Sequence, residues 1–132
     1  MTSSSFGGGA VVYAKDLQRV RTFYEGVVGF AAAYVASDHV VLRLPAFELV
    51  IVTIPRAIAD SLEIAQPPRR RTDTAIKLVF PIHDIAAART VAPRYGGEID
   101  PPEKEWAFQG LRVCDGHDPE GNVIQLRQSN GA

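Results

Sequence analysis

The apolar residues of two segments recur at the spacing of a single helical face. The first segment has them at Leu17, Val20, Phe23, Tyr24 and Val27, and the second at Ile85, Ala88, Val91, Ala92 and Tyr95. Residues three and four apart share one face of a helix, so the spacing predicts amphipathic helices over 17–28 and 85–95. Asp16 and Asp84 directly precede the two segments, where an aspartate caps the first backbone N–H groups.

The two segments are copies of each other, because each apolar position and its aspartate recur 68 residues later. Gly29 and Gly96 follow the segments as helix stops. Pro93 is the discordant residue: a proline removes a helical hydrogen bond and crowds the preceding turn, so the second helix is predicted to kink or end early. Such an internal repeat indicates two supersecondary units that close one core together.

Runs rich in β-branched and aromatic residues surround each helix and predict the strands. They span 10–14, 31–36, 39–44 and 48–54 in the first unit, and 74–80, 97–100, 106–115 and 122–128 in the second. Residues 118–122 read Asp-Pro-Glu-Gly-Asn and predict a turn before the last strand. The predicted fold class is α+β, built from two tandem βαβββ modules.

The predicted organisation is one domain over 10–128, with module one at 10–54, a connector at 55–73 and module two at 74–128. Residues 1–9 are rich in Ser and Gly and are expected to be a flexible tail. The connector is expected to be exposed, with a helical turn near 57–62. Its arginine run, 69–71, is interpreted as a solvated loop in preference to a site.

Composition excludes several classes of partner. With 46% apolar residues the chain can bury a core, and 14 Lys and Arg against 15 Asp and Glu give no global field for nucleic acid or an anionic membrane. No apolar run has the length of a membrane-spanning helix, and the N-terminus lacks the features of a secretory signal. The single cysteine, Cys114, has no disulfide partner in the chain, which favours a reducing, cytoplasmic location.

Two motifs carry a resemblance to a known family. The first helix reads Asp16-Leu-Gln-Arg-Val-Arg-Thr-Phe-Tyr24 and ends at Gly29-Phe30, and the last hairpin reads Asp118-Pro-Glu-Gly-Asn-Val-Ile-Gln-Leu126. Together with the tandem modules, these segments resemble the vicinal oxygen chelate superfamily, the group of glyoxalases, bleomycin resistance proteins and extradiol dioxygenases. The resemblance implies that the strands curl into a cleft, often completed within a homodimer, that holds either a divalent metal or a metal-free ligand.

The same resemblance locates the metal ligands, which are His, Glu or Gln in members that bind a metal. The corresponding positions here are Gly9, Lys77, Gln125 and either Val50 or Val52. Of these only the neutral amide of Gln125 could coordinate a divalent ion. Glu48 would face the cleft only if the register differs. We therefore expect no metal and no cofactor.

The remaining candidate ligands and nucleophile each have a simpler structural interpretation. His39 opens a strand and is expected at the surface, and His83 is expected to bond locally beside the second helix. His117 lies in Asp115-Gly-His-Asp118, which resembles a metal site but is better explained by a turn. Cys114 is expected to be a packed thiol and not a nucleophile.

Alternation along the strands predicts the residues that line the cleft. Val79 shares a face with Lys77, Arg127 with Gln125, and Tyr13 with position 9. The Lys77 ammonium is expected either at the rim, in solvent or paired with Glu48, or in contact with an anionic or carbonyl-bearing ligand. Aromatic residues of both modules complete the predicted ligand-binding set: Trp106 and Phe108 on one strand, and Tyr34 and Phe47 from the other module.

Three functions remain compatible with these residues. The first, which the sequence favours, is a metal-free small-molecule binding protein similar to the bleomycin resistance members, working as a homodimer. The second is an enzyme of the family, a lyase, isomerase or dioxygenase, with a non-standard metal site or with chemistry based on Lys77. The third is a purely structural or interaction module.

Overall fold

The predicted first helix forms as two consecutive helical segments. In the computed structural model, which describes residues 7–129, α1 (Leu17–Phe23) continues directly into a π-helical turn, η1 (Tyr24–Val28). The Asp16 side chain accepts a hydrogen bond from the Arg19 N–H and so caps the helix. Gly29 ends it at a φ of 96°, a left-handed conformation that glycine adopts without strain. The sequence prediction is confirmed here.

The second helix repeats this design with one difference. Asp84 caps α3 (Ile85–Val91) through the Ala87 N–H, and Gly96 ends the segment at a φ of 87°. The last turn, η2 (Ala92–Tyr95), is a 3-10 helix that contains Pro93. Proline cannot donate the backbone hydrogen bond of a regular α-helix, so the predicted early end of α3 is confirmed.

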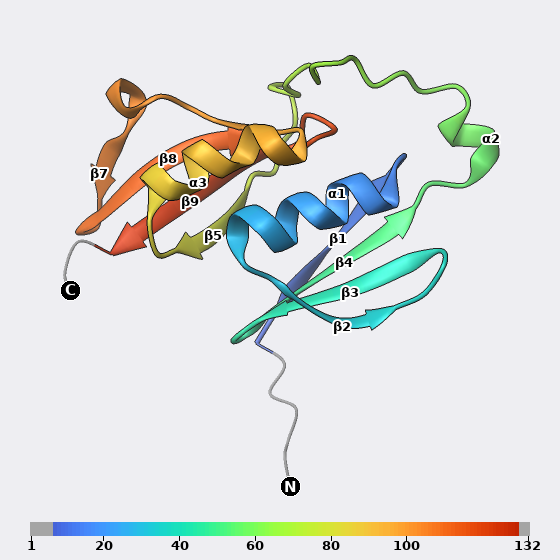
Figure 1. The fold of residues 1–132 in the computed structure, drawn as a ribbon, viewed down its shortest axis with the longest axis horizontal. Helices are drawn as coiled ribbons and strands as arrows, with labels where there is room; N and C mark the ends of the chain where they lie inside the picture. Colours follow the sequence, from blue (N-terminus) through green and yellow to red (C-terminus); the bar gives the residue numbers. More distant parts are fainter. Residues whose placement is uncertain (1–6, 130–132) are drawn as a thin grey trace, which may run out of the picture.

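Module one forms a mixed four-stranded sheet. Its strands are β1 (Gly9–Ala14), β2 (Ala31–Val35), β3 (His39–Leu44) and β4 (Phe47–Thr53). The strand order is β1-β4-β3-β2, in which β1 and β4 are parallel and the other pairs antiparallel. Helix α1 forms the crossover between β1 and β2 (Figure 1).

Module two repeats this topology in a five-stranded sheet. Its strands are β5 (Leu78–Ile82), β6 (Glu98–Ile99), β7 (Trp106–Phe108), β8 (Leu111–His117) and β9 (Val123–Ser129), with a 3-10 turn η3 (Pro102–Lys104) between β6 and β7. The order is β5-β9-β8-β6, β5 and β9 are parallel, and β7 also pairs with β8. The predicted fold class, α+β with two tandem modules, is confirmed.

Two strand predictions in module two are wrong. Residues 106–115 do not form one strand: Gln109 and Gly110 both have positive φ, 53° and 78°, and connect β7 to β8 as a hairpin. A two-residue loop of this kind matches the twist of the paired strands. In the run 74–80, the strand begins only at Leu78. The pairing of β5 with β9 starts at that residue, and residues 74–77 still belong to the connector.

The connector contains a short helix, α2 (Arg56–Ala59), close to the predicted helical turn. The interpretation of its arginine run as a solvated loop is wrong for Arg70, which is half-buried, whereas Arg69 and Arg71 are exposed. Arg70 forms an ion pair with Asp100, and Arg71 forms a β-bridge with Asn122. Of the predicted tail, 1–6 lie outside the described residues, and β1 begins at Gly9.

The core lies between the helices and the two sheets and joins both modules. Its centre is a connected set of aromatic rings, Tyr24 of η1, Phe30 just before β2, Phe47 of β4 and Phe80 of β5. Figure 1 shows α1 and α3 as neighbours at the centre of the molecule, with one sheet beside each helix. Each module therefore buries its helix-facing surface against the other.

Candidate functional site

Each sheet has one face on the shared core and one face that no helix within residues 7–129 covers. In β4, for example, Leu49 and Ile51 are fully buried, while Val50 and Val52, which alternate with them, are only half-buried. We call the uncovered surfaces the first and second open faces. The second open face carries Lys77, Val79, Asp115, Gln125, Arg127, Trp106 and Phe108, placed together by the registers of β5, β7, β8 and β9.

A row of polar side chains crosses the second open face. Lys77 Nζ lies 2.8 Å from Asp115 Oδ2, and Gln125 Nε2 donates to Asp115 Oδ1 at 3.2 Å. Arg127 Nε then donates to Gln125 Oε1 at 2.8 Å. The row therefore runs Lys77, Asp115, Gln125, Arg127, and each member fixes the orientation of the next.

The row ends on an aromatic ring. The guanidinium carbon of Arg127 lies 4.9 Å from the centroid of Phe108, a cation–π arrangement. Phe108 and Trp106 belong to β7 and keep 44% and 41% of their surface exposed, although both are large apolar residues. Two aromatic rings beside an oriented guanidinium form a surface suited to a molecule with an apolar body and an anionic group.

The electrostatics of the row favour an anion. Two cations flank one carboxylate, and both oxygens of that carboxylate already accept hydrogen bonds. Gln125 is 8% exposed, and its amide oxygen and one of its two N–H donors are already used by Arg127 and Asp115, so it offers little to a ligand. The groups that remain to meet a ligand are the outer N–H groups of Arg127 and the ammonium of Lys77, whose side chain is 42% exposed.

Tyr13 lies on the first open face and not beside this row. It is 61% exposed on β1, and Tyr34 on β2 is 57% exposed. Glu48 also faces outward here, as the alternation with Leu49 requires, and it pairs with Arg43 at 3.2 Å and not with Lys77. The structure therefore brings Lys77, Gln125, Arg127 and Phe108 together and leaves Tyr13 on a separate sheet.

Phe47 does not belong to either open face, and its placement among the cleft aromatics is wrong. Its ring contacts Phe30 and Phe80 at centroid distances of 6.3 and 5.7 Å. The reason is the strand period of two: Phe47 shares a face with Leu49 and Ile51, which are both fully buried. It is a core residue that joins the modules.

The residues present do not fit the divalent metal that this kind of fold can hold. Within residues 7–129 no three His, Cys, Asp or Glu side chains lie close enough together to bind an ion. The one carboxylate beside Gln125 is already paired with an ammonium, so a metal there would have to displace Lys77. The absence of a metal remains a prediction for experiment.

The Asp118–Asn122 turn clamps the two modules together, which the sequence did not indicate. Asp118 is fully buried and accepts hydrogen bonds from the Glu120 and Asn122 N–H groups, as the turn interpretation predicts, and also from the Tyr24 hydroxyl of module one. The Glu120 carboxylate accepts from the N–H groups of Lys15 and Asp16 at 2.9 and 2.7 Å. The motif is therefore structural.

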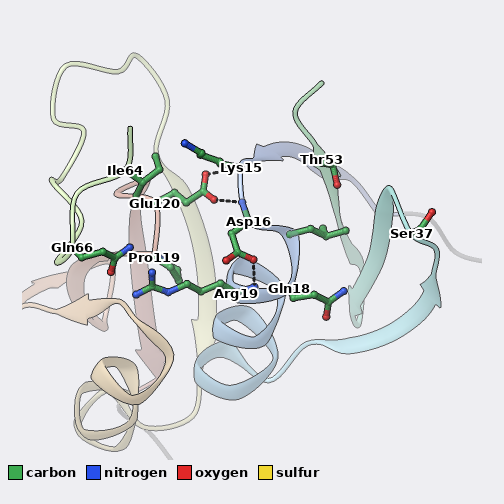
Figure 2. Close-up of a pocket in the computed structure, with 11 residues that line it drawn as sticks. Lys15, Asp16, Gln18, Arg19, Ser37, Thr53, Ile64, Gln66, Pro119 and Glu120 are labelled. Carbon is green, nitrogen blue, oxygen red and sulfur yellow. Dashed lines mark hydrogen bonds between the residues drawn. The ribbon is translucent and has the colours of Figure 1, made fainter. Parts of the chain in front are cut away.

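Figure 2 shows the hollow that borders this clamp, a pocket of about 470 Å³ at the start of α1. Lys15, Gln18, Arg19, Gln66 and Glu120 contribute its polar lining. The Glu120 carboxylate is occupied by backbone N–H groups, and Asp16 is occupied by capping, so the acidic groups of this hollow are already satisfied. We assign it to the module junction and not to ligand binding.

His117 is buried and accepts a hydrogen bond from a cation. Arg70 Nε donates to His117 Nδ1 at 2.9 Å, and the same guanidinium contacts Asp100 at 2.9 Å. Burial first, and the charge of Arg70 second, lower the pKa of His117 below its ordinary value of 6.5. The imidazole is therefore a structural acceptor that holds the connector, and His117 lies at the end of β8 and not in the predicted turn.

Three further side chains were singled out in the sequence: His39, His83 and Cys114. His39 Nδ1 lies 2.8 Å from Asp38 Oδ1 at the surface, and His83 is exposed beside α3. Cys114 is fully buried, and burial raises the pKa of its thiol. Cys114 therefore packs as predicted, and the local hydrogen bond expected of His83 stays a prediction.

Sequence reasoning missed Asp115 and Arg70. The available signal for Asp115 was strand alternation, which places it on the same face of β8 as Val113. The sequence gives no register between β8 and β9, so the contact of Asp115 with Gln125 could not be derived. For Arg70 no signal separates an anchored arginine from a solvated one.

Within residues 7–129, no helix combines the length and the apolar character that crossing a bilayer requires.

Comparison with solved structures identifies the fold. A glyoxalase/bleomycin resistance/dioxygenase family enzyme of Burkholderia phytofirmans aligns with a TM-score of 0.67 at 15% identity, covering 94% of this chain and 98% of that chain. A glyoxalase/bleomycin resistance protein of Albidiferax ferrireducens gives 0.63 at 22% identity, covering 95% and 98%. The fosfomycin resistance protein FosX of Listeria monocytogenes gives 0.63 at 18% identity, covering 98% and 95%.

Sequence comparisons add nothing to this result. No family model matches the chain, and no curated protein matches it either. At these identities a structural likeness carries fold and not activity. The resemblance seen in the sequence is therefore confirmed as a resemblance of fold: the chain has the fold of the glyoxalase, bleomycin resistance and dioxygenase proteins, the vicinal oxygen chelate fold.

Proposed function

We propose that this protein binds a small molecule, without a metal ion, on the second open face. The ligand carries a carboxylate or a similar anionic or carbonyl group on an aromatic or amphipathic body. The observation that carries this proposal is the row Lys77, Asp115, Gln125, Arg127, in which hydrogen bonds orient two cations on an otherwise apolar surface. An arginine held in this way is a preorganised partner for a planar carboxylate.

The aromatic residues supply the second half of the proposed site. Phe108 already stacks under the Arg127 guanidinium, and Trp106 lies two residues before it on the same face of β7. Rings of this size bury a large area of an aromatic ligand at little cost in side-chain entropy. A ligand placed here would meet rings on one side and the Arg127 N–H groups at its anionic end.

The proposed working unit is a homodimer. Several large apolar side chains of the first open face and its edge are about half exposed: Val11, Tyr13, Tyr34 and Val35. Contiguous exposed apolar surface of this kind usually marks a contact with another molecule. A second copy that covers the second open face with its first open face would enclose the ligand and would place Tyr13 at the site, as expected from the sequence.

The proposal is tested by a thermal-shift screen of aromatic and aliphatic carboxylates, followed by calorimetric titration of the best compound. Arg127→Met should weaken binding by about 1.5–3 kcal/mol, the contribution of a hydrogen bond between charged groups. Arg56→Met is the matched control, because Arg56 is an exposed arginine of α2 outside the site. Equal affinities for Arg127→Met and wild type would contradict the proposed site.

Two further measurements separate this proposal from its alternatives. Chromatography of the bound compound after incubation detects turnover, and conversion that is lost in Lys77→Met would replace the binding role with an enzymatic one. Metal analysis of protein purified without chelator should find no stoichiometric zinc, nickel, iron or manganese. Such a metal, lost again in Gln125→Ala, would overturn the metal-free assignment.

Light scattering at micromolar concentration tests the assembly. We expect a dimer, and Tyr13→Lys together with Val11→Lys should shift it toward monomer, because buried charges without partners oppose the contact. A monodisperse wild-type monomer would contradict the homodimer.

A further inference from the structure

The connector folds back on module two and leaves a second hollow there. It runs from α2 to β5 as the long green arch of Figure 1. At its far end a pocket of about 370 Å³ lies between the connector and the second sheet, with Arg70, Arg71, Thr72, Thr74, Lys77 and Asp115 as its polar lining. This hollow is separate from the one at the module junction, and none of its lining residues contacts the Arg127 guanidinium in the row described above.

The two arginines of this pocket are held in place by the protein. The Arg71 backbone N–H donates to the Gly121 carbonyl at 2.8 Å, and Arg71 Nε donates to the Glu120 carbonyl at 3.0 Å. Arg70 is fixed by Asp100 and by His117, and its side chain is 25% exposed. The entropy of ordering these long side chains is therefore lost already on folding, and a ligand need not supply it.

The charges of the pocket are unbalanced. Its lining holds three cations and one carboxylate, but Arg70 is already paired with Asp100 and Lys77 with Asp115, which leaves one cation, Arg71, unbalanced. The carboxylate of Asp115 is occupied on both oxygens, by Lys77 and Gln125. The Arg71 guanidinium uses Nε for a neutral carbonyl and forms no ion pair within residues 7–129. Donors thus exceed acceptors, in a chain whose formal net charge is −1.

Such a lining selects an oxyanion. Arginine presents several N–H groups in a planar fork that matches two oxygens of a phosphate or a carboxylate. The hydroxyl group of Thr72 can add a donor, whereas the Thr74 hydroxyl already donates to the Ile76 carbonyl at 3.4 Å. Neither a cation nor a neutral apolar molecule would satisfy this arrangement.

We infer that the pocket between the connector and the second sheet binds the oxyanion group, phosphate or carboxylate, of a small molecule, with Arg71 as the principal contact and Lys77 and the Thr72 hydroxyl beside it. This site goes beyond the function proposed above and does not rest on it. The two sites share only the Lys77–Asp115 pair. Arg71 belongs to the connector pocket alone, and Arg127 belongs to the second open face alone.

The test uses the full chain and simple anions at constant ionic strength. Inorganic phosphate, sulfate and acetate are titrated separately in a chloride background, with amide chemical shifts in two-dimensional NMR as the readout. We expect saturable shifts confined to residues 70–77 and the neighbouring part of β9. Saturation by phosphate and sulfate would indicate a phosphate-like ligand, and saturation by acetate a carboxylate.

Variants decide which residues are responsible. Arg71→Met should lower the affinity for the preferred anion about tenfold or more, as expected for the loss of a charge-assisted hydrogen bond. Arg56→Met, on the same connector but outside the pocket, should leave that affinity unchanged. A melting temperature for Arg71→Met equal to that of wild type shows that the variant is folded, and Thr72→Val provides a second variant, with a smaller expected loss, that removes no charge.

Three results would overturn the inference. They are shifts that grow linearly with every salt, shifts that saturate only at residues outside the pocket, and equal affinities for wild type and Arg71→Met. If Arg127→Met lowered the affinity for carboxylates but not for phosphate, the result would support two separate sites. Loss of the open-face ligand alone would refute the proposed function and not this site.

Discussion

The hydroxyl of Tyr24 donates a 2.7 Å hydrogen bond to Oδ2 of Asp118, a residue 94 positions later in the other module. Both residues are completely buried. Asp118 also organises its own turn by accepting from the Glu120 and Asn122 N–H groups, so one carboxylate links the last hairpin to the π-helical turn of module one. The two halves of the repeat are therefore joined by a polar contact at the edge of their aromatic core.

Removing this hydroxyl should destabilise the protein without changing its fold. Tyr24→Phe keeps the ring contacts with Phe23, Phe30 and Phe80 but leaves one oxygen of a buried carboxylate with fewer donors. We expect the free energy of unfolding to fall by about 1.5–3 kcal/mol, measured by urea denaturation. Tyr13→Phe, at an exposed tyrosine, is the control and should fall within about 0.5 kcal/mol of wild type. Similar losses in the two variants would refute the role of the Tyr24–Asp118 contact.

The repeat made this junction partly predictable. The apolar positions and caps of both helices could be derived from one offset, and the open faces from strand alternation, because both depend only on local periodicity. Phe47 could also have been placed in the core by the same alternation, since it is two residues before Leu49.

Other features depend on contacts that local periodicity does not encode. Lys77 was expected beside Glu48 if it was paired at all, whereas its partner is Asp115, which the register of β8 against β9 brings to Gln125. The Tyr24–Asp118 bond and the anchoring of Arg70 likewise join residues far apart in sequence. The β7–β8 hairpin was different: the Gln109-Gly110 pair is a local turn signal that the strand interpretation overlooked.

The contact between Arg70 and His117 predicts a dependence of stability on pH. The folded protein holds the pKa of His117 below 6.5, by burial first and by Arg70 second, although Glu98, Asp118 and Asp100 act in the opposite direction. Below pH 6.5 the unfolded chain therefore binds more protons at this residue than the folded protein does. This contribution to stability is complete above that pH and is lost as the pH falls toward the folded value.

Urea denaturation between pH 7.5 and pH 5 measures this effect. His117→Asn places an amide oxygen near the position of Nδ1, so it can still accept from Arg70, but it does not titrate. We expect the free energy of unfolding of wild type to decline more steeply than that of the variant across this range. Parallel curves would show that His117 contributes nothing to the pH dependence.

The thiol of Cys114 should be protected from reagents in the folded protein. Its side chain is fully buried, and burial raises the pKa of the thiol, so little thiolate forms. Arg89 Nη2 lies 3.7 Å from the sulfur but also forms an ion pair with Glu105. A disulfide reagent at neutral pH should label the protein only after denaturant is added, and fast labelling of the native protein would contradict the assignment of Cys114 as a packed residue.

The Lys77–Asp115 pair should matter for ligand binding and little for stability. The Lys77 side chain is 42% exposed and that of Asp115 is 21% exposed, so solvent screens their attraction and the pair is expected to contribute at most about 1 kcal/mol. Lys77→Met keeps most of the volume of the side chain and removes the ammonium. We expect its free energy of unfolding to stay within that margin of wild type, while the affinity for an anionic open-face ligand falls by about 1.5–3 kcal/mol.

Asp115→Asn is the matched variant that separates the two effects. It removes the negative charge, so it also weakens the Lys77 contact, but it leaves the ammonium on the open face and should preserve or strengthen anion binding. The double variant should bind as weakly as Lys77→Met, because the contact with the ligand belongs to the ammonium and not to the ion pair. If Asp115→Asn lost as much affinity as Lys77→Met, the carboxylate would be the ligand-binding group, and the second open face would recognise a donor in place of an anion.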